Sequence, residues 1–163
     1  MTKGVPLRAA ALALALAGCA SGPGAPLTVT RVTPEAPQAS TTSGLHDYTR
    51  AAVFDARTFG DLWTRAYSDR TPPPPAPAID FAREFALVVA LGEHATGGYG
   101  IEIARVTARG GHVEARVVTS TPGKGCVVAA MMTQPLDVVR VPRPRAGELD
   151  VRFADTLVVR DCR

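Results

Sequence analysis

The sequence predicts a mainly β fold, an antiparallel β-sandwich or a small curled barrel with one packed α-helix. Short apolar runs of strand composition follow one another between residues 85 and 160, and a Gly-Gly pair joins two of them. Only residues 59–67 repeat apolar side chains with helical spacing. The 15 glycines and 14 prolines among 163 residues argue against a helical bundle. The length fits one ordinary domain with a short appendage, so we expect a single domain over residues 44–163.

The first 18 residues have the pattern of an export signal. Lys3 and Arg8 precede the apolar run AAALALALA, which is too short to cross a bilayer as a helix. The run leads into LAGC, which is similar to the bacterial lipobox, where the cysteine is acylated and becomes the new N-terminus. We therefore expect a lipoprotein signal peptide over residues 1–18 and a lipid anchor on Cys19. The alternative is ordinary secretion with cleavage nearby.

The anchor predicts a location in the bacterial cell envelope, either on the periplasmic side of the outer membrane or at the cell surface. Residues 19–43 are rich in Ser, Gly, Pro, Thr and Ala, a composition that buries too little apolar surface to fold alone. We expect a flexible tether here. The alternating segment of residues 27–30 could still join a sheet as an edge strand.

Charge and residue spacing exclude several classes of function. Without Lys3 and Arg8, 16 of the 18 basic side chains remain against 15 acidic ones, a net charge of +1 that points to no nucleic-acid partner. The three histidines have no metal-ligand spacing, and no serine stands in a G-x-S-x-G elbow. Glu93 and His94 are adjacent, and adjacent side chains on a strand end point apart. We expect no metal, no cofactor, no small-molecule substrate and no enzymatic activity.

The domain begins with a predicted strand and helix. Residues 48–54, YTRAAVF, suit a strand, and Asp55 then stands in an N-cap position. One helical face carries five apolar side chains: Phe59, Leu62, Trp63, Ala66 and Tyr67. The helix should end before the prolines of residues 72–77, which we interpret as an extended connector to the next strand, or as a ligand for a partner domain.

The remaining segments are predicted strands. Residues 85–93 form a continuous apolar run, typical of a central strand buried on both faces. Two further strands should form a hairpin around Gly110 and Gly111. Its register places Ala104 opposite Val117, Ile103 opposite Val118 and Arg105 opposite Arg116, the last a conflict of like charges. About four more short strands are expected in residues 126–133, 135–142, 149–153 and 155–161.

Two cysteines remain once Cys19 is lipidated. Cys126 and Cys162 form an even pair in a compartment where disulfides persist, so we expect a bond between them. Two buried free thiols, or a metal pair that lacks further ligands, are the alternatives.

The glycine-rich segment of residues 95–100, ATGGYG, lies between two predicted strands. Glycines allow close backbone approach, and a tyrosine offers a rigid contact surface. The segment is either a structural connection that folds Tyr99 onto the core or a loop that contacts a partner. We take Thr96, Gly97, Gly98 and Tyr99 as candidate partner-binding residues.

Several motifs of the sequence resemble the C-terminal domain of the protease complex subunit PrcB family. They are FxxLW at residues 59–63, IDF at 79–81, LVVALGE at 87–93, TGGYGI at 96–101 and the strand at 135–142. The resemblance covers roughly residues 54–142, and TGGY is its most specific element. Family members are bacterial and often lipoproteins, and the name derives from a subunit associated with a surface serine protease. The resemblance implies a non-catalytic domain that binds, assembles or stabilises an envelope protease.

The same loop is also similar to the T-G-Y loop of chagasin-like cysteine-protease inhibitors, which are β-sandwiches that wedge this loop into the protease cleft. Here Thr96 to Tyr99 carries one extra glycine, and the flanking Asn-Pro and the downstream Trp of that motif are missing. This resemblance implies protease inhibition as the alternative function. In either case Tyr99 would be the anchor of the contact.

Overall fold

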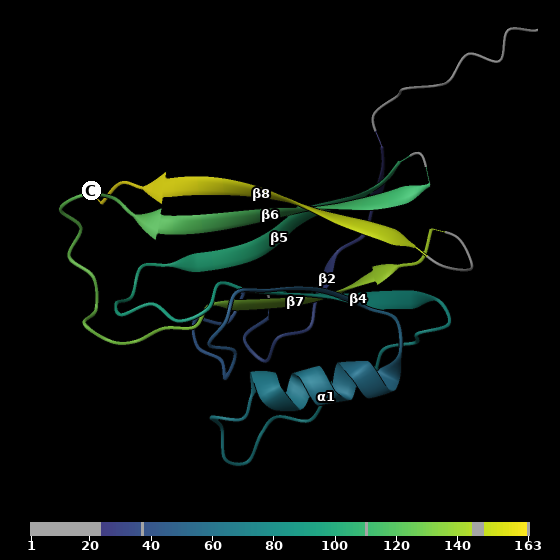
Figure 1. The fold of residues 1–163 in the computed structure, drawn as a ribbon, viewed down its shortest axis with the longest axis horizontal. Coiled ribbons are helices and arrows are strands. Elements are labelled where there is room, and N and C mark those ends of the chain that lie inside the picture. The colour runs from purple at the N-terminus through teal and green to yellow at the C-terminus, as the bar shows by residue number, and fades with distance from the viewer. Residues whose placement is uncertain (1–23, 37, 110, 145–148, 163) are drawn as a thin grey trace, which may run out of the picture.

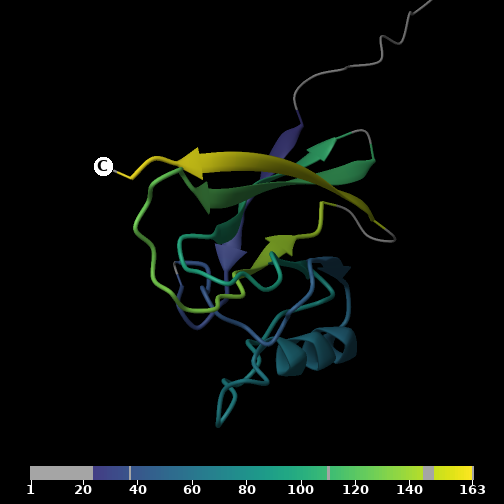
Figure 2. The same cartoon turned by 60° about the vertical axis from the view of Figure 1, so that its left-hand side comes forward.

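The computed structural model describes residues 24–36, 38–109, 111–144 and 149–162. The predicted signal peptide and Cys19 lie outside these residues. The described residues form two β-sheets stacked face to face (Figures 1 and 2). One helix packs on the outer face of one of these sheets. The described residues contain no closed barrel. The predicted mainly β fold with one packed helix is therefore confirmed, and of the two alternatives it is the sandwich.

Each sheet has four strands. The first sheet has the order β1-β5-β6-β8, with β1 at Ala25–Leu27, β5 at Gly100–Arg109, β6 at His112–Pro122 and β8 at Asp150–Arg160. The second has the order β2-β7-β4-β3, with β2 at Thr30–Arg31, β7 at Leu136–Pro142, β4 at Glu84–Ala90 and β3 at Thr49–Val53. All neighbouring strands are antiparallel except β6 and β8, which are parallel.

The helix α1, Ala56–Ala66, begins where the sequence predicts. The Asp55 carboxylate accepts the Thr58 N–H at 2.8 Å, which satisfies a donor that has no partner inside the helix. The predicted apolar face of the helix packs on Ala86, Val88 and Ala90 of β4 and on Leu136 and Val138 of β7. After the helix, the proline connector is held by the Trp63 Nε1–H, which donates to the Pro74 carbonyl at 2.9 Å.

Strand β4 is the central strand of the molecule. Its even-numbered residues face α1, while Phe85, Leu87 and Val89 face the first sheet, and residues 85–90 are all buried. This confirms the expectation of a strand buried on both faces. The core between the sheets also includes Ile101 and Ile103 of β5, among others. No helix in the described residues is long and apolar enough to span a membrane.

The N-terminal segment does not match the predicted tether over its described part. β1 and β2 are edge strands, one in each sheet, and Leu27 and Val29 pack against the core between the sheets. Further along, Thr33, Ser40 and Ser43 are buried. The folded part of the chain therefore includes residues 25–36 and 38–43, because even two short strands can bury apolar side chains at the open side of a sandwich.

The hairpin of β5 and β6 follows the predicted register only near its turn. Arg105 lies opposite Arg116 as expected, but a bulge between Ile103 and Arg105 shifts the pairing, so that Ile103 lies opposite Val117. The predicted pairs of Ala104 with Val117 and of Ile103 with Val118 are therefore wrong. The bulge places both Ala104 and Arg105 on the exposed side and turns Ile103 into the core, where it is 2% exposed.

The strand prediction also differs at the C-terminal end. Residues 149–153 and 155–161 contribute to one continuous strand, β8. Residues 126–133 contain no strand; they belong to the long connection from β6 in the first sheet to β7 in the second. A segment that crosses between sheets cannot continue a ladder in either one, whatever its strand propensity.

Candidate partner-binding site

The four candidate loop residues lie between β4 and β5, against the long connection of residues 123–135. The Thr96 carbonyl accepts the Thr133 hydroxyl at 3.0 Å, and the Gly97 N–H donates to the Ala129 carbonyl at 2.9 Å. Gly97 is buried. Thr96 and Gly97 are therefore held by the chain itself, and they position the residues that follow.

Gly98 is the residue of this loop that only glycine can occupy. Its φ is +88°, a torsion that other residues rarely adopt. A Cβ at this position would lie 2.8 Å from Val128 Cγ1 and 3.2 Å from Pro122 Cβ. The exposed backbone of Gly98 thus runs close over the neighbouring connection and reaches the surface beside Tyr99.

Tyr99 is half-buried, and one face of its ring is covered. The ring stacks on that of His94, with centroids 4.0 Å apart and planes 15° apart. The backbone of His94 is fixed by two hydrogen bonds with Thr133, of 2.8 and 2.9 Å. Tyr99 is therefore a rigid part of the surface rather than a projecting side chain. The loop is a structural connection, and its contact with a partner stays a prediction.

A groove of about 480 Å³, here called the Tyr99 groove, opens beside this loop. Its walls come from β5, β6, the end of β8 and the N-terminal segment. The lining residues are Arg31, Gln38, Ala39, Ser40, Thr41, Gly98, Tyr99, Gly100, Ile101, Glu102, Val118, Ser120 and Arg160. Gly98 and Tyr99 are thus the candidate residues that the structure brings to this groove, whereas Thr96 and Gly97 do not line it.

A buried ion pair fixes one wall of the groove. Arg31 contacts both oxygens of Asp137, with Nε–Oδ1 at 2.5 Å and Nη2–Oδ2 at 2.8 Å. Asp137 is fully buried on β7, and its Oδ2 also accepts the Ile103 N–H at 2.8 Å. The hydrogen bond to Asp137 raises the pKa of Arg31, and burial opposes this effect. This carboxylate joins β2, β7 and the bulged part of β5.

The sequence offered only a weak signal for this arrangement. Asp137 is the one acidic residue in the strand PLDVVRVP, in which Arg140 is the only other charged residue, and such a carboxylate is buried only with a partner. Arg31 lies in the segment predicted as a tether, so the pairing could not be inferred from spacing.

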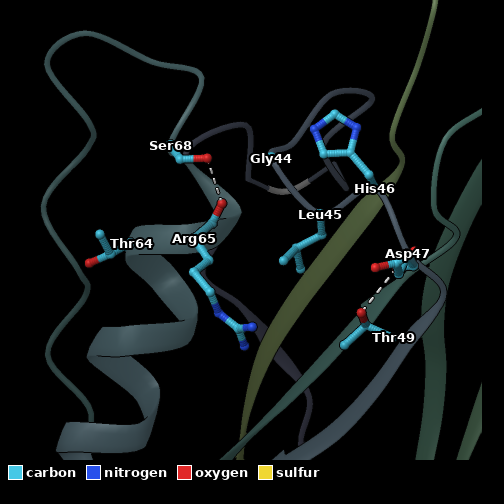
Figure 3. A pocket seen from close by; sticks show the side chains of 8 residues that line it. All are labelled: Gly44, Leu45, His46, Asp47, Thr49, Thr64, Arg65 and Ser68. Carbon is cyan, nitrogen blue, oxygen red and sulfur yellow. Dashed lines mark hydrogen bonds between the residues drawn. The ribbon is translucent and has the colours of Figure 1, made fainter.

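A second hollow of about 360 Å³ lies between the end of α1 and residues 44–49 (Figure 3). At its rim His46 Nδ1 lies 2.8 Å from Glu93 Oε2, and this hydrogen bond lowers the pKa of Glu93. Both side chains are exposed, at 63% and 42%. Glu93 thus pairs with His46 and His94 with Tyr99, so the two adjacent residues point to different partners.

The cysteines predicted to pair lie at disulfide distance. The Cα atoms of Cys126 and Cys162 are 5.3 Å apart. This pair joins the start of the long connection to the chain just after β8, on the side of the molecule that carries Tyr99. Among the residues the structure describes, no group of three or more His, Cys, Asp and Glu side chains could hold a metal ion.

Comparison with known proteins identifies one family. Residues 85–142 match the sequence model of the family described as PrcB C-terminal. No curated protein and no solved structure matches the chain. The matched segment runs from β4 to β7 and contains the loop of residues 94–99, Asp137 and most of the β5 and β6 wall of the Tyr99 groove. The resemblance to this family is therefore confirmed over residues 85–142.

Proposed function

We propose, because residues 85–142 match the PrcB C-terminal family, that this chain is a non-catalytic subunit associated with a protease complex. Its β domain would bind, assemble or stabilise a protein partner, a secreted or surface protease. The observation that carries the proposal is the position of the Tyr99 groove, whose Gly98–Glu102 wall lies inside the matched segment.

The groove has the features of a surface that recognises another chain. It combines exposed backbone at Gly98, half-buried backbone at Gly100, an aromatic ring held in one orientation, and a polar rim. Tyrosine held rigidly contributes contact area at low cost in conformational entropy. These features favour a protein partner.

The lipid anchor on Cys19 is part of the proposal. Gly24, the first described residue, lies next to Ala108 near the turn of the β5–β6 hairpin, whereas Tyr99 lies just before the opposite end of β5. An anchor at Cys19 would thus hold one end of the sandwich and leave the groove at the other. This arrangement would suit a module of the bacterial cell envelope, on the periplasmic side of the outer membrane or at the cell surface.

The alternative, a chagasin-like inhibitor, requires a loop that projects into a protease cleft. Thr96 and Gly97 are hydrogen-bonded to the connection of residues 123–135, and Tyr99 lies against His94. This geometry favours a docking surface over a wedge. An assay of cysteine-protease activity with the purified chain separates the two, since a docking subunit leaves the protease active.

The proposal is tested by capturing partners of the tagged lipoprotein from gently solubilised envelopes. Wild type is compared with Tyr99→Ala and with Tyr48→Ala, a matched variant at an exposed tyrosine outside the groove. We expect a protease in the wild-type and Tyr48→Ala captures and a strong reduction with Tyr99→Ala. Capture of the same protease by all three variants, or of none by wild type, contradicts the proposal.

A further inference from the structure

Strand β5 has an edge that is only partly covered. β6 pairs with its whole length on one side, but on the other side β1 pairs only with Val106–Ala108. From Gly100 to Ile103, no strand of the described residues lies on this second edge. An uncovered edge presents backbone donors and acceptors to any extended chain that fits.

The hydrogen bond from Ile103 to Asp137 shows which backbone groups face this edge. Because the Ile103 N–H donates to the Asp137 carboxylate, it points away from β6. In an antiparallel pair, both backbone groups of such a residue face outward, and the same holds two residues along. Ile101, which lies opposite Thr119, must therefore present its N–H and C=O at the edge, together with the Ile103 C=O.

The edge lies in a continuous depression. The Tyr99 groove follows it from Gly98 to Glu102, with Ser40 and Thr41 among the residues opposite. Another hollow of about 400 Å³, distinct from the one beside α1, continues the depression toward the bulge. It is lined by Val29, Arg31, Glu102, Ile103 and Ala104. Arg31 and Glu102 line both. The space is of the size that binding sites in proteins occupy.

The structure limits what can pair with this edge. The bulge after Ile103 interrupts the ladder at one end, and Asp137 already occupies the Ile103 N–H. These are devices that discourage indiscriminate pairing of sheet edges. A specific partner can therefore use about three residues of the edge, centred on Ile101.

Two charged side chains beside the edge determine which charges a bound segment should carry. Glu102 and Arg160 line the groove, and both are exposed. Neither is within 4.0 Å of an opposite charge among the described residues, although the charge of Glu102 contributes to the raised pKa of Arg31. Opposite residues of an antiparallel pair share a face of the sheet. A basic residue opposite Glu102 would pair with its carboxylate. An acidic residue opposite Gly100 could pass over the small Ser120 side chain to Arg160.

We propose that an extended segment of the protein partner adds to β5 as an antiparallel strand, with the pattern basic, apolar, acidic opposite Glu102, Ile101 and Gly100. This inference rests on the proposed function and specifies how the partner would be recognised. The central residue of the segment exchanges two backbone hydrogen bonds with Ile101, which supply affinity, while the flanking charges supply direction and register.

The test uses the capped peptide Thr-Val-Lys-Val-Glu-Val-Thr and the full chain labelled with ¹⁵N. In the free chain the Ile101 amide should exchange with deuterium faster than that of Glu102, whose N–H faces β6. The peptide should slow Ile101 exchange and shift its resonance. A peptide with an N-methyl group on the central Val keeps its charge but lacks the donor to the Ile101 carbonyl, and should bind at least tenfold more weakly.

A second control tests the charges. A peptide with Lys and Glu exchanged should bind wild type at least fivefold more weakly, and the double variant Glu102→Lys, Arg160→Glu should reverse this preference. Slow exchange of Ile101 in the free chain, no change at Ile101 on adding the peptide, or equal binding of the N-methyl peptide overturns the proposal.

Peptide binding tests strand addition to β5, whereas partner capture tests the proposed subunit function, and the two can fail independently. If the captured protease stays bound at saturating peptide, strand addition is overturned while the subunit function stands. If the peptide binds at Ile101 but envelopes yield no protease, the proposed function fails and the edge is still a peptide site.

Discussion

At the scale of single residues, the Asp137 side chain connects the two sheets through hydrogen bonds. It is fully buried, it binds Arg31 from the N-terminal segment, and it accepts the N–H of Ile103 from the opposite sheet. A buried ion pair is not itself strong evidence for stability, because removing two charges from water is costly. Loss of one partner alone is costly for the same reason, since the other charge then lacks compensation.

We therefore predict that Asp137→Ala lowers the free energy of unfolding by about 3–5 kcal/mol. The matched control is Asp155→Ala, which removes an ion pair with Arg50 in which the Asp155 side chain is 44% exposed. That change should cost about 1 kcal/mol or less. Urea unfolding measures both. The double variant Arg31→Met, Asp137→Leu should recover only part of the loss, because the Ile103 N–H still lacks its acceptor, and an equal effect of the two Ala variants would contradict this account.

Tyr67 is buried at the end of α1 with a hydroxyl that has no hydrogen-bond partner among the described residues. Burial raises the pKa of Tyr67 to about 12. The nearby Ser40 hydroxyl, which opposes this rise, donates its own hydrogen to the Glu35 carboxylate. The folded state thus favours the neutral phenol.

This has a defined consequence at high pH. Since the folded pKa lies above the ordinary value of about 10, the stability due to the neutral phenol is complete below pH 10. It is lost as the pH rises from about 10 to 12, and the total loss should be about 3 kcal/mol. We predict that Tyr67→Phe removes this part of the alkaline loss and leaves stability at pH 7 unchanged or higher. Urea midpoints at pH 7 and pH 11 test this; parallel losses in both chains would contradict it.

Residue patterns alone could anticipate only part of these interactions. The apolar face that ends in Tyr67 was visible in the sequence, because helical spacing places these residues on one side. The partner of Asp137 was not visible, since Arg31 is 106 residues away and lies in a segment of low apolar content. Charge pairs that join distant segments leave no trace in local periodicity.

At the scale of elements, the sequence predicted those with a strong local signal. The helix follows a helical period, β4 is a continuous apolar run, and a Gly-Gly pair indicates the hairpin turn. β1 and β2 have three and two residues, too few for any period to show. The bulge in β5 was missed because the predicted register also gave one apolar face, and only the burial of Ile103 distinguishes the two.

The loop of residues 94–99 allows a sharp test of which candidate residues are structural. Gly98→Ala combines an unfavourable φ with a Cβ 2.8 Å from Val128, and we expect it to cost about 1–3 kcal/mol. Gly97→Ala meets Ala129 Cβ only at 3.4 Å, an ordinary contact, and should cost less than about 1 kcal/mol. Thermal unfolding compares the two.

Gly111→Ala is the control for the torsion alone. Gly111 has a φ of +89° but open space around its Cβ position. Any excess loss for Gly98→Ala therefore reports the packing of the loop against the connection of residues 123–135. A larger loss at Gly97 than at Gly98 would show that the loop is held differently.

At the scale of the whole molecule, the parallel pairing of β6 and β8 is the least predictable feature. A parallel neighbour requires a crossover, and here β7 in the other sheet supplies it. Alternation of apolar residues specifies the buried face of a strand but not its direction or its sheet. The crossover also carries the connection of residues 123–135, which covers the loop beside Tyr99.

The path of the N-terminal segment determines how the domain would sit on a membrane. Gly24 already lies against Ala108 of β5, and only four residues separate it from Cys19, so the five Cα–Cα steps between them can span at most about 18 Å. β5 extends ten residues from this point, about 30 Å, to the end that carries Tyr99. A lipid on Cys19 would therefore keep Arg109 near the bilayer and hold the Tyr99 groove away from it.

We predict that a fluorophore at Arg109→Cys in the lipidated chain is quenched more strongly by spin-labelled lipids than one at Met132→Cys. Met132 is exposed in the connection of residues 123–135, which lies against the loop that carries Tyr99. A spacer of about 15 Gly and Ser residues inserted between residues 23 and 24 should lower the quenching at Arg109, because a flexible chain of that length allows the domain to move away. Equal quenching at the two sites before insertion would mean that both ends of the domain lie at a similar distance from the bilayer. The Tyr99 groove would then have to meet its partner at the membrane surface, rather than at a distance from it.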